Sequence, residues 1–312
     1  MKIAFLLYPT EGIKVREDTS FWIMHELRRR GHRVFHFLSE ALFWQGGDAR
    51  AFVRETRTHA VKGFLPSSLS DKAISLSGMD CIFIRKEPPF DRGYLVALQL
   101  LEGIKDRVFV LNDPTGIAMA GEKLFTLNFK RWVPDTCVTE DPEVATGFIR
   151  SLGARVVVKP LHLKGGSGVV ALSPSDRNLL SILEMSTVQG TEKVMVQRFI
   201  DADRYGDKRI LILDGKILGT FVRKPSKTDF RANLSRGASL HKSPPTLQDT
   251  QMAAEIAPEL EKRGLWFVGL DVIGKYLTEI NVTSPAGIAD LKVLHHTRPE
   301  TKVADFLESK TR

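Results

Sequence analysis

FVGLDVIGKYLTEINVTSP, residues 267–285, contains two apolar runs separated by a Gly-Lys dipeptide, a pattern that predicts two antiparallel strands. Glu279 and Asn281 are two positions apart, so on a strand both side chains point to the same face of the sheet. Asp271 lies on the neighbouring strand, where an acidic side chain among apolar residues is costly unless its charge is compensated. The three side chains predict a Mg²⁺ site, with simple pairing to Lys or Arg as the alternative.

A second strand pair is predicted upstream of this segment. The apolar runs 209–213 and 216–223 flank an Asp-Gly dipeptide, a strong signal for a two-residue hairpin. Arg209 and Arg223 lie on these strands, and guanidinium groups can bind planar anions through two hydrogen bonds. We therefore predict that they hold an acyl-phosphate or substrate carboxylates, although each one alone could belong to a surface ion pair.

The stretch 224–245 is polar, contains glycine and proline, and lacks apolar periodicity. That length without periodicity predicts a mobile loop, or lid, rather than a connection through a core. Arg231 and Asn233 within it are candidates for contacting the substrate. A helix is predicted to follow at 247–263.

A loop of small residues, LHLKGGSG at 161–168, lies between strands predicted at 155–159 and 169–172. Small residues let backbone N–H groups approach phosphate oxygens closely. Neither the P-loop pattern nor the Rossmann glycine fingerprint is present. The loop predicts a flap over phosphates, with a plain hairpin turn as the alternative. Its candidate residues are Gly165, Gly166 and Ser167.

Two lysines and one strand end complete the candidate nucleotide site. Lys159 ends the strand before the glycine loop, and Lys123 lies in the string GEKLF. Two ammonium groups would supply the positive charge that phosphates need, although a lone lysine is ordinarily a solvated surface residue. The end of a strand predicted at 194–199 could hold an adenine ring, or it could be an ordinary buried strand end. Its residues are Gln197, Arg198, Phe199 and Ile200.

The N-terminal part alternates apolar strands with amphipathic helices, which predicts a parallel sheet covered by helices. The expected strands are 2–8, 34–37, 81–85 and 108–111, and the expected helices are 18–30 and 93–103. No element is predicted for 44–78, because this segment lacks periodicity.

Further helices are predicted at 114–129 and 176–188. The fold class is α/β, and we expect three domains. They are an N-terminal parallel-sheet domain at 1–120, a small central α+β domain at 121–200 and a C-terminal α+β domain at 201–312.

Composition excludes several functional classes. The chain has 312 residues, of which 43% are hydrophobic and 26% charged, as in ordinary globular proteins. The net charge of +8 is spread along the chain without the basic-aromatic alternation of single-strand binders, so we expect acidic small-molecule substrates and no nucleic acid. No apolar run suits a membrane span or a secretory signal, and Cys81 and Cys137 make no disulfide framework. We expect a cytoplasmic protein without a membrane partner.

Several blocks, taken in order, resemble bacterial glutathione synthetase, a family of the ATP-grasp superfamily. They are EKLFT, VVKPL with its glycine loop, GDKRILILDG, FVGLDVIG and LTEINVTSP. EDTSF, IRKEPPFD and LNDP in the N-terminal half resemble that family too. The resemblance covers about residues 1–290, and its specificity comes from the order of the blocks together.

The resemblance implies an ATP-grasp fold in which a central lid domain and a C-terminal domain hold ATP between two sheets. It implies a carboxylate–amine ligase that makes glutathione from γ-glutamylcysteine, glycine and ATP through an acyl-phosphate, with Mg²⁺ or Mn²⁺, in a homo-oligomer. It assigns Lys123 and Lys159 to the ATP phosphates, 165–167 to the flap, 197–200 to the adenine and 224–238 to a closing loop. It also implies that Asp271, Glu279 and Asn281 bind Mg²⁺. The transferred phosphoryl group would be held by Arg209 and Arg223.

The sequence departs from the family pattern in two loops. His162-Leu163 replaces the usual Asp-Gly, and alanines replace glycines at Ala232 and Ala238. Losing glycines stiffens both loops. These departures leave the acceptor open, so a related ATP-grasp amino-acid or peptide ligase with another acceptor is one alternative. A non-catalytic nucleotide-binding regulator is a second alternative, against which the intact metal-binding residues argue.

Overall fold

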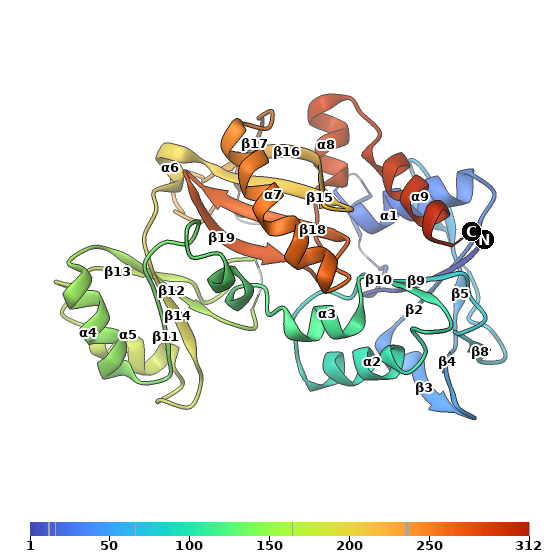
Figure 1. Ribbon diagram of the computed structural model, residues 1–312, viewed down its shortest axis with the longest axis horizontal. Helices are drawn as coiled ribbons and strands as arrows, with labels where there is room; N and C mark the ends of the chain where they lie inside the picture. The colour runs from blue at the N-terminus through green and yellow to red at the C-terminus, as the bar shows by residue number, and fades with distance from the viewer. Residues whose placement is uncertain (12, 16, 66, 164, 235–236, 312) are drawn as a thin grey trace.

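Three main sheets with their covering helices make up most of the fold (Figure 1), and the described residues form two further small sheets. The computed structural model describes residues 1–312 except 12, 16, 66, 164, 235–236 and 312. An N-terminal lobe contains the parallel sheet, a second lobe contains a small antiparallel sheet, and the third sheet lies between them (Figure 1). The α/β fold class is thereby confirmed.

The N-terminal sheet has the strand order β10-β9-β1-β2-β5, and all of its strands except β5 are parallel. Successive residues of β1 point to opposite faces: Phe5 packs in the core with α1, and Leu6 packs with α2. Both faces are covered, which explains the continuous apolar runs of these strands. The bounds are β1 Lys2–Leu6, β2 Arg33–Phe37, β5 Arg54–Glu55, β9 Cys81–Ile84, β10 Phe109–Leu111, α1 Thr19–Arg29, α2 Arg92–Glu102 and α3 Pro114–Met119.

The small sheet is antiparallel, with the order β11-β14-β12-β13. Val156 and Val158 of β12 face a core shared with α4 and α5, so the residues between and after them, Val157 and Lys159, face the other side. The sheet therefore has one apolar, helix-covered face and one face free to line a pocket. The bounds are β11 Thr136–Thr139, β12 Val156–Pro160, β13 Val170–Leu172, β14 Val194–Arg198, α4 Pro142–Leu152 and α5 Leu179–Ser186.

The third sheet has the order β17-β16-β15-β18-β19 and is antiparallel throughout. Asp214 and Gly215 both have positive φ, which is the conformation of the predicted two-residue hairpin. α7 starts with a capping box formed by Thr246 and Asp249 and covers one face of this sheet (Figure 1). The bounds are α6 Ala202–Tyr205, β15 Asp207–Leu213, β16 Lys216–Lys224, β17 Ser239–Lys242, α7 Leu247–Lys262, β18 Phe267–Ile273 and β19 Tyr276–Asn281.

The C-terminal helices, α8 (Ile288–His295) and α9 (Pro299–Lys310), return the chain to the N-terminal lobe. The Thr311 hydroxyl lies 2.7 Å from the Met1 sulfur, so the two ends of the described chain lie side by side. Glu26 of α1, only 1% exposed, accepts hydrogen bonds from Arg29 (2.8 Å), Arg30 (2.9 Å) and Arg298 (2.6 Å). These bonds join α1 to the C-terminal helices.

Replacing Glu26 by Gln is expected to lower the free energy of unfolding by about 2 to 3 kcal/mol at neutral pH. The hydrogen bond from Arg29, with help from Arg30 and Arg298, lowers the pKa of Glu26 from 4.5 to about 2. The contribution is therefore present above about pH 4.5 and disappears as the pH falls towards 2. Urea denaturation of the wild type and of Glu26→Gln between pH 7 and pH 2 measures this contribution, with exposed Glu261→Gln as the control. If the difference in unfolding free energy between wild type and Glu26→Gln did not change with pH, the prediction would be contradicted.

The remaining strands are short and lie in the segment for which nothing was predicted. Their lengths of two to four residues leave no room for a periodic pattern. They pair as β3-β4-β8 and β6-β7 beside the N-terminal sheet. Their bounds are β3 Leu42–Gln45, β4 Asp48–Ala51, β6 Arg57–His59, β7 Gly63–Leu65 and β8 Ile74–Ser75, and a 3₁₀ turn, η1, spans Ser39–Ala41.

The predicted helix at 114–129 starts at the right place but is too long. α3 ends at Met119, and a separate 3₁₀ turn, η2, spans Leu124–Asn128. The reason lies at Glu122, whose backbone carbonyl accepts a hydrogen bond from the Ile280 N–H (2.9 Å) instead of continuing a helix. The stretch 224–245, for which a loop was predicted, contains one strand, β17. Residues 235–236 of this stretch lie outside the described residues.

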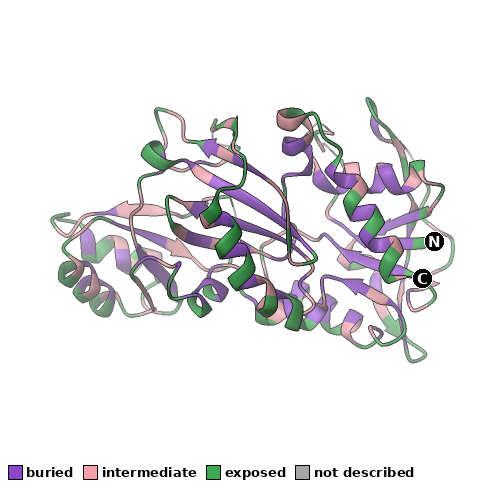
Figure 2. Cartoon of the chain, turned by 45° about the horizontal axis from the view of Figure 1, so that its top comes forward, coloured by how far each residue is buried: buried purple, intermediate pink, exposed green. Residues whose placement is uncertain are grey.

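The strands of the three sheets are largely buried, whereas the helices expose one face to solvent (Figure 2). Among the described residues, no helix is long and apolar enough to cross a membrane.

Candidate active site

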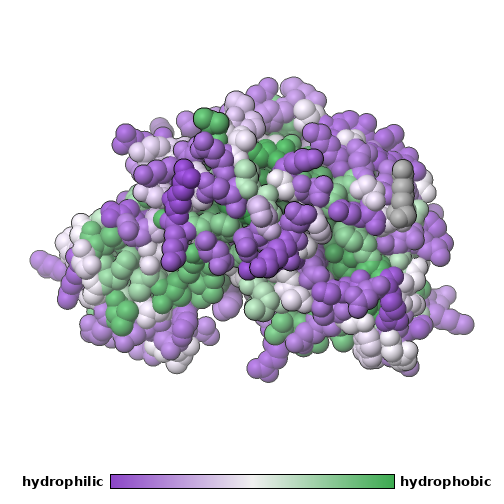
Figure 3. All heavy atoms as spheres, in the orientation of Figure 1, coloured by the Kyte–Doolittle hydropathy of each residue, from purple (hydrophilic) through white to green (hydrophobic). Residues whose placement is uncertain are grey.

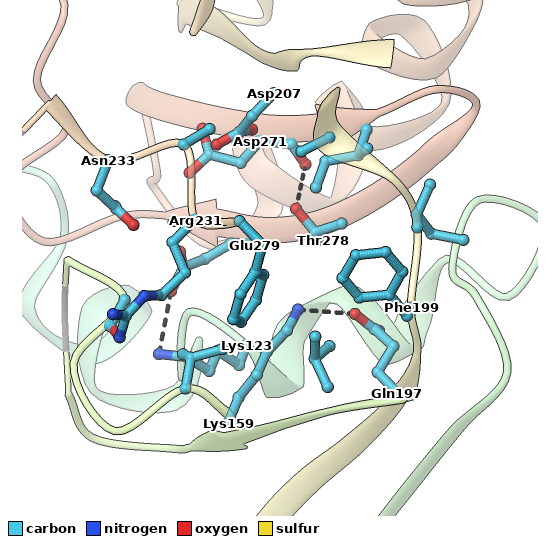
Figure 4. A pocket seen from close by; sticks show the side chains of 18 of the residues that line it. Lys123, Lys159, Gln197, Phe199, Asp207, Arg231, Asn233, Asp271, Thr278 and Glu279 are labelled. Carbon is cyan, nitrogen blue, oxygen red and sulfur yellow. Dashed lines mark hydrogen bonds and ion pairs between the residues drawn. The ribbon is translucent and has the colours of Figure 1, made fainter. Parts of the chain in front are cut away.

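A pocket lies between the small sheet and the third sheet, and it collects most of the candidate residues (Figure 4). Asp271 lines the pocket. Arg209 and Asn281 do not line it, but both form hydrogen bonds with Asp271. The candidate residues that line the pocket are Lys123, Lys159, Gly165, Gly166, Ser167, Gln197, Arg198, Phe199, Ile200, Arg223, Arg231, Asn233, Asp271 and Glu279.

The wall formed by the third sheet is a buried cluster of charges. Arg209 grips the Asp271 carboxylate with two hydrogen bonds, 2.6 Å from Nε and 2.9 Å from Nη2. Arg223 Nη2 lies 2.9 Å from the same carboxylate and 2.7 Å from that of Asp207. Burial alone would raise the pKa of Asp271, but Arg209 and Arg223 outweigh it and hold that pKa below its ordinary value.

Asp271 and Glu279 are paired across β18 and β19, so the predicted placement on one sheet is correct. Asn281 Nδ2 donates to Asp271 Oδ2 at 3.0 Å. Lys123 Nζ lies 3.1 Å from the Glu279 carboxylate and donates to the Leu163 carbonyl at 2.7 Å. The alternative prediction, pairing with Lys or Arg, therefore also describes these carboxylates.

The donor set suits Mg²⁺ if phosphate supplies further ligands. Mg²⁺ takes one or two carboxylates together with phosphate oxygens and water. Two carboxylates and one amide lie together here, and the described part of the chain holds no cluster of three or more His, Cys, Asp or Glu side chains that would make an all-protein cage.

The opposite wall of the pocket carries the second lysine. Lys159 donates to Gln197 Oε1 at 2.8 Å, and Gln197 Nε2 in turn donates to Thr136 Oγ1 at 2.9 Å (Figure 4). Burial lowers the pKa of Lys159 from 10.5 to about 8, with Lys123 adding to this effect and Glu279 opposing it. Among the described residues, no carboxylate forms an ion pair with this half-buried lysine, although the charge of Glu279 favours its ammonium form.

The flap and the lid stretch touch each other across the pocket mouth. Arg231 Nη1 donates to the Gly166 carbonyl at 2.8 Å, while Asp229 holds the same guanidinium at 2.7 Å. Gly166 has φ +69°, and a Cβ there would lie 2.5 Å from Asn233 Oδ1. Glycine is therefore required at this close approach.

An aromatic cluster lies at the end of β14. The Phe199 ring lies 6.0 Å from the Phe230 ring of the lid stretch, and the Arg155 guanidinium stacks on Phe199 at 4.2 Å. These apolar faces, next to the backbone of residues 198–200, are suited to a flat heterocycle.

Among the residues that sequence reasoning missed are Asp207 and Phe230, which line this pocket, and Glu122, which binds the segment just after β19. Asp207 lines the pocket, and burial raises its pKa to about 6 even though Arg223 opposes the shift. It stands two positions before Arg209, so strand periodicity could have placed it near the same face. Phe230 lines the pocket from the lid, and Glu122 accepts from the Val282 N–H (3.0 Å) at the end of β19. Nothing local in the sequence signals either one.

The space-filling view separates two kinds of surface. In this view, hydrophobic side chains gather over the lobe of β11–β14, α4 and α5, while hydrophilic side chains cover most of the rest (Figure 3). Among the exposed apolar residues of α4 and α5 are Val144, Leu180 and Met185.

ATP-grasp ligases share this architecture, in which a pocket lies between two antiparallel sheets and a further lobe holds a parallel sheet. The solved ATP-grasp ligase PsnB, complexed with its minimal precursor, matches with a TM-score of 0.67 at 16% identity over 99% of both chains. The D-cycloserine synthetase DcsG matches with a TM-score of 0.68 at 14% identity, over 98% of this chain and 99% of its own. ATP-grasp enzymes use ATP with Mg, and one PsnB structure contains Mg and ADP.

The chain belongs to the prokaryotic glutathione synthetase family. The model of that family's N-terminal domain matches residues 1–118, and the model of its ATP-grasp domain matches residues 122–296. The glutathione synthetase of Gloeobacter violaceus is 39% identical over 318 residues, covering 100% of this chain and 98% of its own. That of Brucella melitensis is 36% identical over 310 residues, covering 99% of both. The activity is that of a glutathione synthetase, an ATP-dependent C–N ligase.

Proposed function

We propose that this chain joins the cysteinyl carboxylate of γ-glutamylcysteine to the amine of glycine through an acyl-phosphate, converting ATP to ADP and phosphate. The observation that carries the proposal is the pocket between the two sheets. It brings together two lysines, Arg223 and three carboxylates, which are those of Asp271, Glu279 and Asp207. Arg209 lies behind the lining and binds Asp271. A carboxylate has no good leaving group, and phosphorylation supplies one.

Lys123 and Lys159 bind the phosphates of ATP in this proposal. Both line the pocket, Lys123 buried and Lys159 half-buried, and phosphate oxygens would give Lys159 an anionic partner that none of the described residues provides. Arg209 and Arg223 hold the transferred phosphoryl group, because they present guanidinium groups beside Asp271. The backbone of residues 197–200 holds the adenine between apolar neighbours.

Asp271, Glu279 and Asn281 would hold Mg²⁺, or Mn²⁺ in its place, which neutralises phosphate charge when bound. Each carboxylate already has a cationic partner, Arg209 and Arg223 for Asp271 and Lys123 for Glu279. Lys123 can exchange Glu279 for a phosphate and still have an anionic partner, because a phosphate oxygen then takes the place of the carboxylate.

Arg231 and Asn233, with flap residues 165–167, close over the reacting groups. The Arg231–Gly166 hydrogen bond already links lid and flap. Closure excludes water, which would otherwise hydrolyse the acyl-phosphate before the amine attacks it.

ATP binding near pH 8 is expected to take up about half a proton at Lys159, because the ammonium is then about half protonated and phosphate favours its charged form. The uptake should vanish well below pH 8, where Lys159 is already charged. Calorimetry in buffers of different ionisation enthalpy measures it. Lys159→Arg is the matched variant, since a guanidinium stays charged; the same uptake in that variant would rule out Lys159 as its source.

The substrates are tested by ADP release with γ-glutamylcysteine and single amino acids, together with mass spectrometry of the product. The expected result is strong acceleration by glycine and formation of glutathione. Glycine that fails to accelerate ADP release would overturn the proposal.

A related ATP-grasp ligase with another acceptor is the second candidate. The observation in its favour is Leu163, which stands in place of a glycine and lines both the nucleotide pocket and a neighbouring, largely apolar cavity of about 300 Å³. Faster ADP release with a larger amino acid than with glycine would favour this candidate.

We place the enzyme in the cytoplasm and expect a homo-oligomer. Cys81 and Cys137 are both free thiols, as is usual in a reducing compartment. The apolar side chains on the surface of α4 and α5 offer a face that a second copy could cover. Light scattering on the purified chain measures the oligomer size.

A further inference from the structure

The edge of the third sheet that carries the proposed metal ligands is covered by the segment after α3. Among the described residues, β19 is the outermost strand on this side of the sheet. An edge strand leaves N–H groups without partners in the sheet. Here the Ile280 N–H donates to the Glu122 carbonyl at 2.9 Å, and the Leu277 N–H donates to the Trp132 carbonyl at 2.7 Å. Residues 122–132 therefore supply the acceptors that a neighbouring strand would supply.

The Glu122 side chain continues this pairing beyond the end of the strand. Its Oε1 accepts from the Val282 N–H at 3.0 Å, from the Thr283 N–H at 3.1 Å and from the Thr283 hydroxyl at 2.8 Å. Hydrogen bonds to a carboxylate are stronger than those between neutral groups. Three donors on one oxygen therefore fix the backbone that directly follows Asn281.

Asn281 is held from the side of β18 as well. Its Nδ2 donates to Asp271 Oδ2 at 3.0 Å and to the Gly269 carbonyl at 3.3 Å. Both bonds use the donor end of the amide, so neither of them occupies the amide oxygen, Oδ1. Hard cations such as Mg²⁺ take oxygen ligands. The hydrogen bonds thus orient Asn281 in the way that a metal ligand requires.

The residue after Glu122 contacts the other proposed ligand on this strand. Lys123 Nζ lies 3.1 Å from the Glu279 carboxylate (Figure 4). The Lys123 carbonyl accepts from the Thr126 hydroxyl at 2.6 Å, which holds this lysine at the start of η2. Two consecutive residues, Glu122 and Lys123, therefore bind β19 at Glu279, at Ile280 and just beyond Asn281.

The charge of Glu122 is unfavourable for the folded chain alone. Burial and the charge of Glu279 raise the pKa of Glu122, while its hydrogen bonds with Thr283 and Val282 lower that pKa. A glutamine would accept the same hydrogen bonds through its amide oxygen and would not repel Glu279. A carboxylate is favoured over that amide where a cation binds close by, because the negative charges then attract the cation together.

We propose that Glu122 is a positioning residue for the divalent cation. It fixes the chain on both sides of Asn281, so that the Asn281 amide oxygen and the Glu279 carboxylate face one point, and its charge adds to the attraction for the cation. Hydrogen-bond partners that hold metal ligands in place typically change the metal affinity about 10- to 100-fold when they are removed. This inference rests on the proposed metal site.

The first test measures Mn²⁺ binding to the protein with ADP, from the electron paramagnetic resonance signal of free Mn²⁺, so that no turnover is needed. Glu122→Ala removes the charge and the side-chain hydrogen bonds, and it is expected to bind Mn²⁺ about 10- to 100-fold more weakly than the wild type. Glu122→Gln keeps an oxygen acceptor and should lose only about two- to fivefold. Equal losses in the two variants, or no loss in Glu122→Ala, would overturn the positioning role.

Glu255→Ala is the matched control. Glu255 of α7 accepts from the Trp132 ring N–H and from Arg131, both at 2.7 Å, so it holds the far end of the same covering segment. Its removal should lower the stability and leave Mn²⁺ binding at the wild-type value. An equal loss of Mn²⁺ binding in Glu255→Ala would overturn the specific role of Glu122, because any loosening of the segment would then suffice.

Thr283→Val carries the test if Glu122→Ala does not fold. It removes one of the three donors to Glu122, and it should weaken Mn²⁺ binding about two- to tenfold. Mn²⁺ binding at the wild-type value in Thr283→Val would then count against the proposal.

The second test needs neither metal nor nucleotide. Glu122, Val282 and Thr283 line the cavity of about 300 Å³ beside the nucleotide pocket, so water can reach the two amides once their hydrogen bonds open. Hydrogen–deuterium exchange at Val282 and Thr283 should be about tenfold faster in Glu122→Ala and close to wild type in Glu122→Gln. Unchanged exchange in Glu122→Ala would overturn the proposal.

The same Mn²⁺ measurement on Glu279→Gln separates this inference from the proposed metal site. Weaker binding in Glu279→Gln supports that site. Binding as tight as in the wild type would refute the site instead, and the exchange rates alone would then decide whether Glu122 fixes the end of β19.

Discussion

A Glu279→Gln enzyme is expected to release ADP about 100-fold more slowly than the wild type. The carboxylate is one of the two that lie together on β18 and β19, and it is the partner of Lys123 at 3.1 Å. The substitution keeps the shape of the side chain but removes its charge, so Mg²⁺ should bind more weakly. Titration of Mg²⁺ at saturating ATP measures this, and higher Mg²⁺ should restore part of the rate.

Glu261→Gln is the matched control, because it makes the same chemical change at an exposed position near the end of α7. It should leave both the rate and the Mg²⁺ dependence at wild-type values. A Glu279→Gln enzyme with an unaltered rate and Mg²⁺ dependence would exclude Glu279 as a metal-binding group.

The third sheet could be predicted because its signals are local. An Asp-Gly turn set the β15–β16 hairpin, and the spacing of Asp271, Glu279 and Asn281 placed three polar side chains at one position of the sheet. Each of these inferences needs only strand periodicity and a short turn. The glycine loop was also placed correctly between its two strands, β12 and β13.

Long-range partners could not be predicted. Glu122 interrupts the expected helix because its backbone carbonyl accepts from Ile280 of β19, and its carboxylate accepts from Val282 and Thr283 just after that strand, about 160 positions later. Arg85 depends on Ser20 and Pro285, which no local pattern connects to it. α4 is a different case: Asp141 caps it, proline follows, and Gly153 ends it with positive φ, so the signals were present and went unused.

The metal and ion-pair interpretations of the acidic residues do not exclude each other. Lysine and arginine side chains of the site pair with Asp271 and Glu279. Such pairing compensates the cost of burying these carboxylates. The same cations are the groups that a triphosphate needs, so we infer that nucleotide and metal enter by exchanging partners within a nearly neutral cluster.

An Arg209→Ala enzyme is expected to lose about 100- to 1000-fold in turnover and about 3 kcal/mol of stability. Arg209 makes three hydrogen bonds, two to Asp271 and one to the Ala286 carbonyl, and Arg223 alone would then neutralise the buried Asp271 carboxylate. Without Arg209 the pKa of Asp271 should rise, because burial raises it and one of the two opposing guanidinium groups is gone. The acidic limb of the pH–rate profile should therefore move to higher pH.

Arg209→Lys separates the two effects. It keeps a positive charge beside Asp271 but loses the two-pronged grip, so the stability should largely recover while turnover stays well below wild type. Thermal unfolding followed by circular dichroism measures the first quantity, and single-turnover ADP formation measures the second. Full recovery of turnover in Arg209→Lys would mean that charge alone suffices, and it would assign Arg209 to holding Asp271 rather than to the phosphoryl group. A loss of turnover without any shift of the acidic limb would instead separate Arg209 from the ionisation of Asp271.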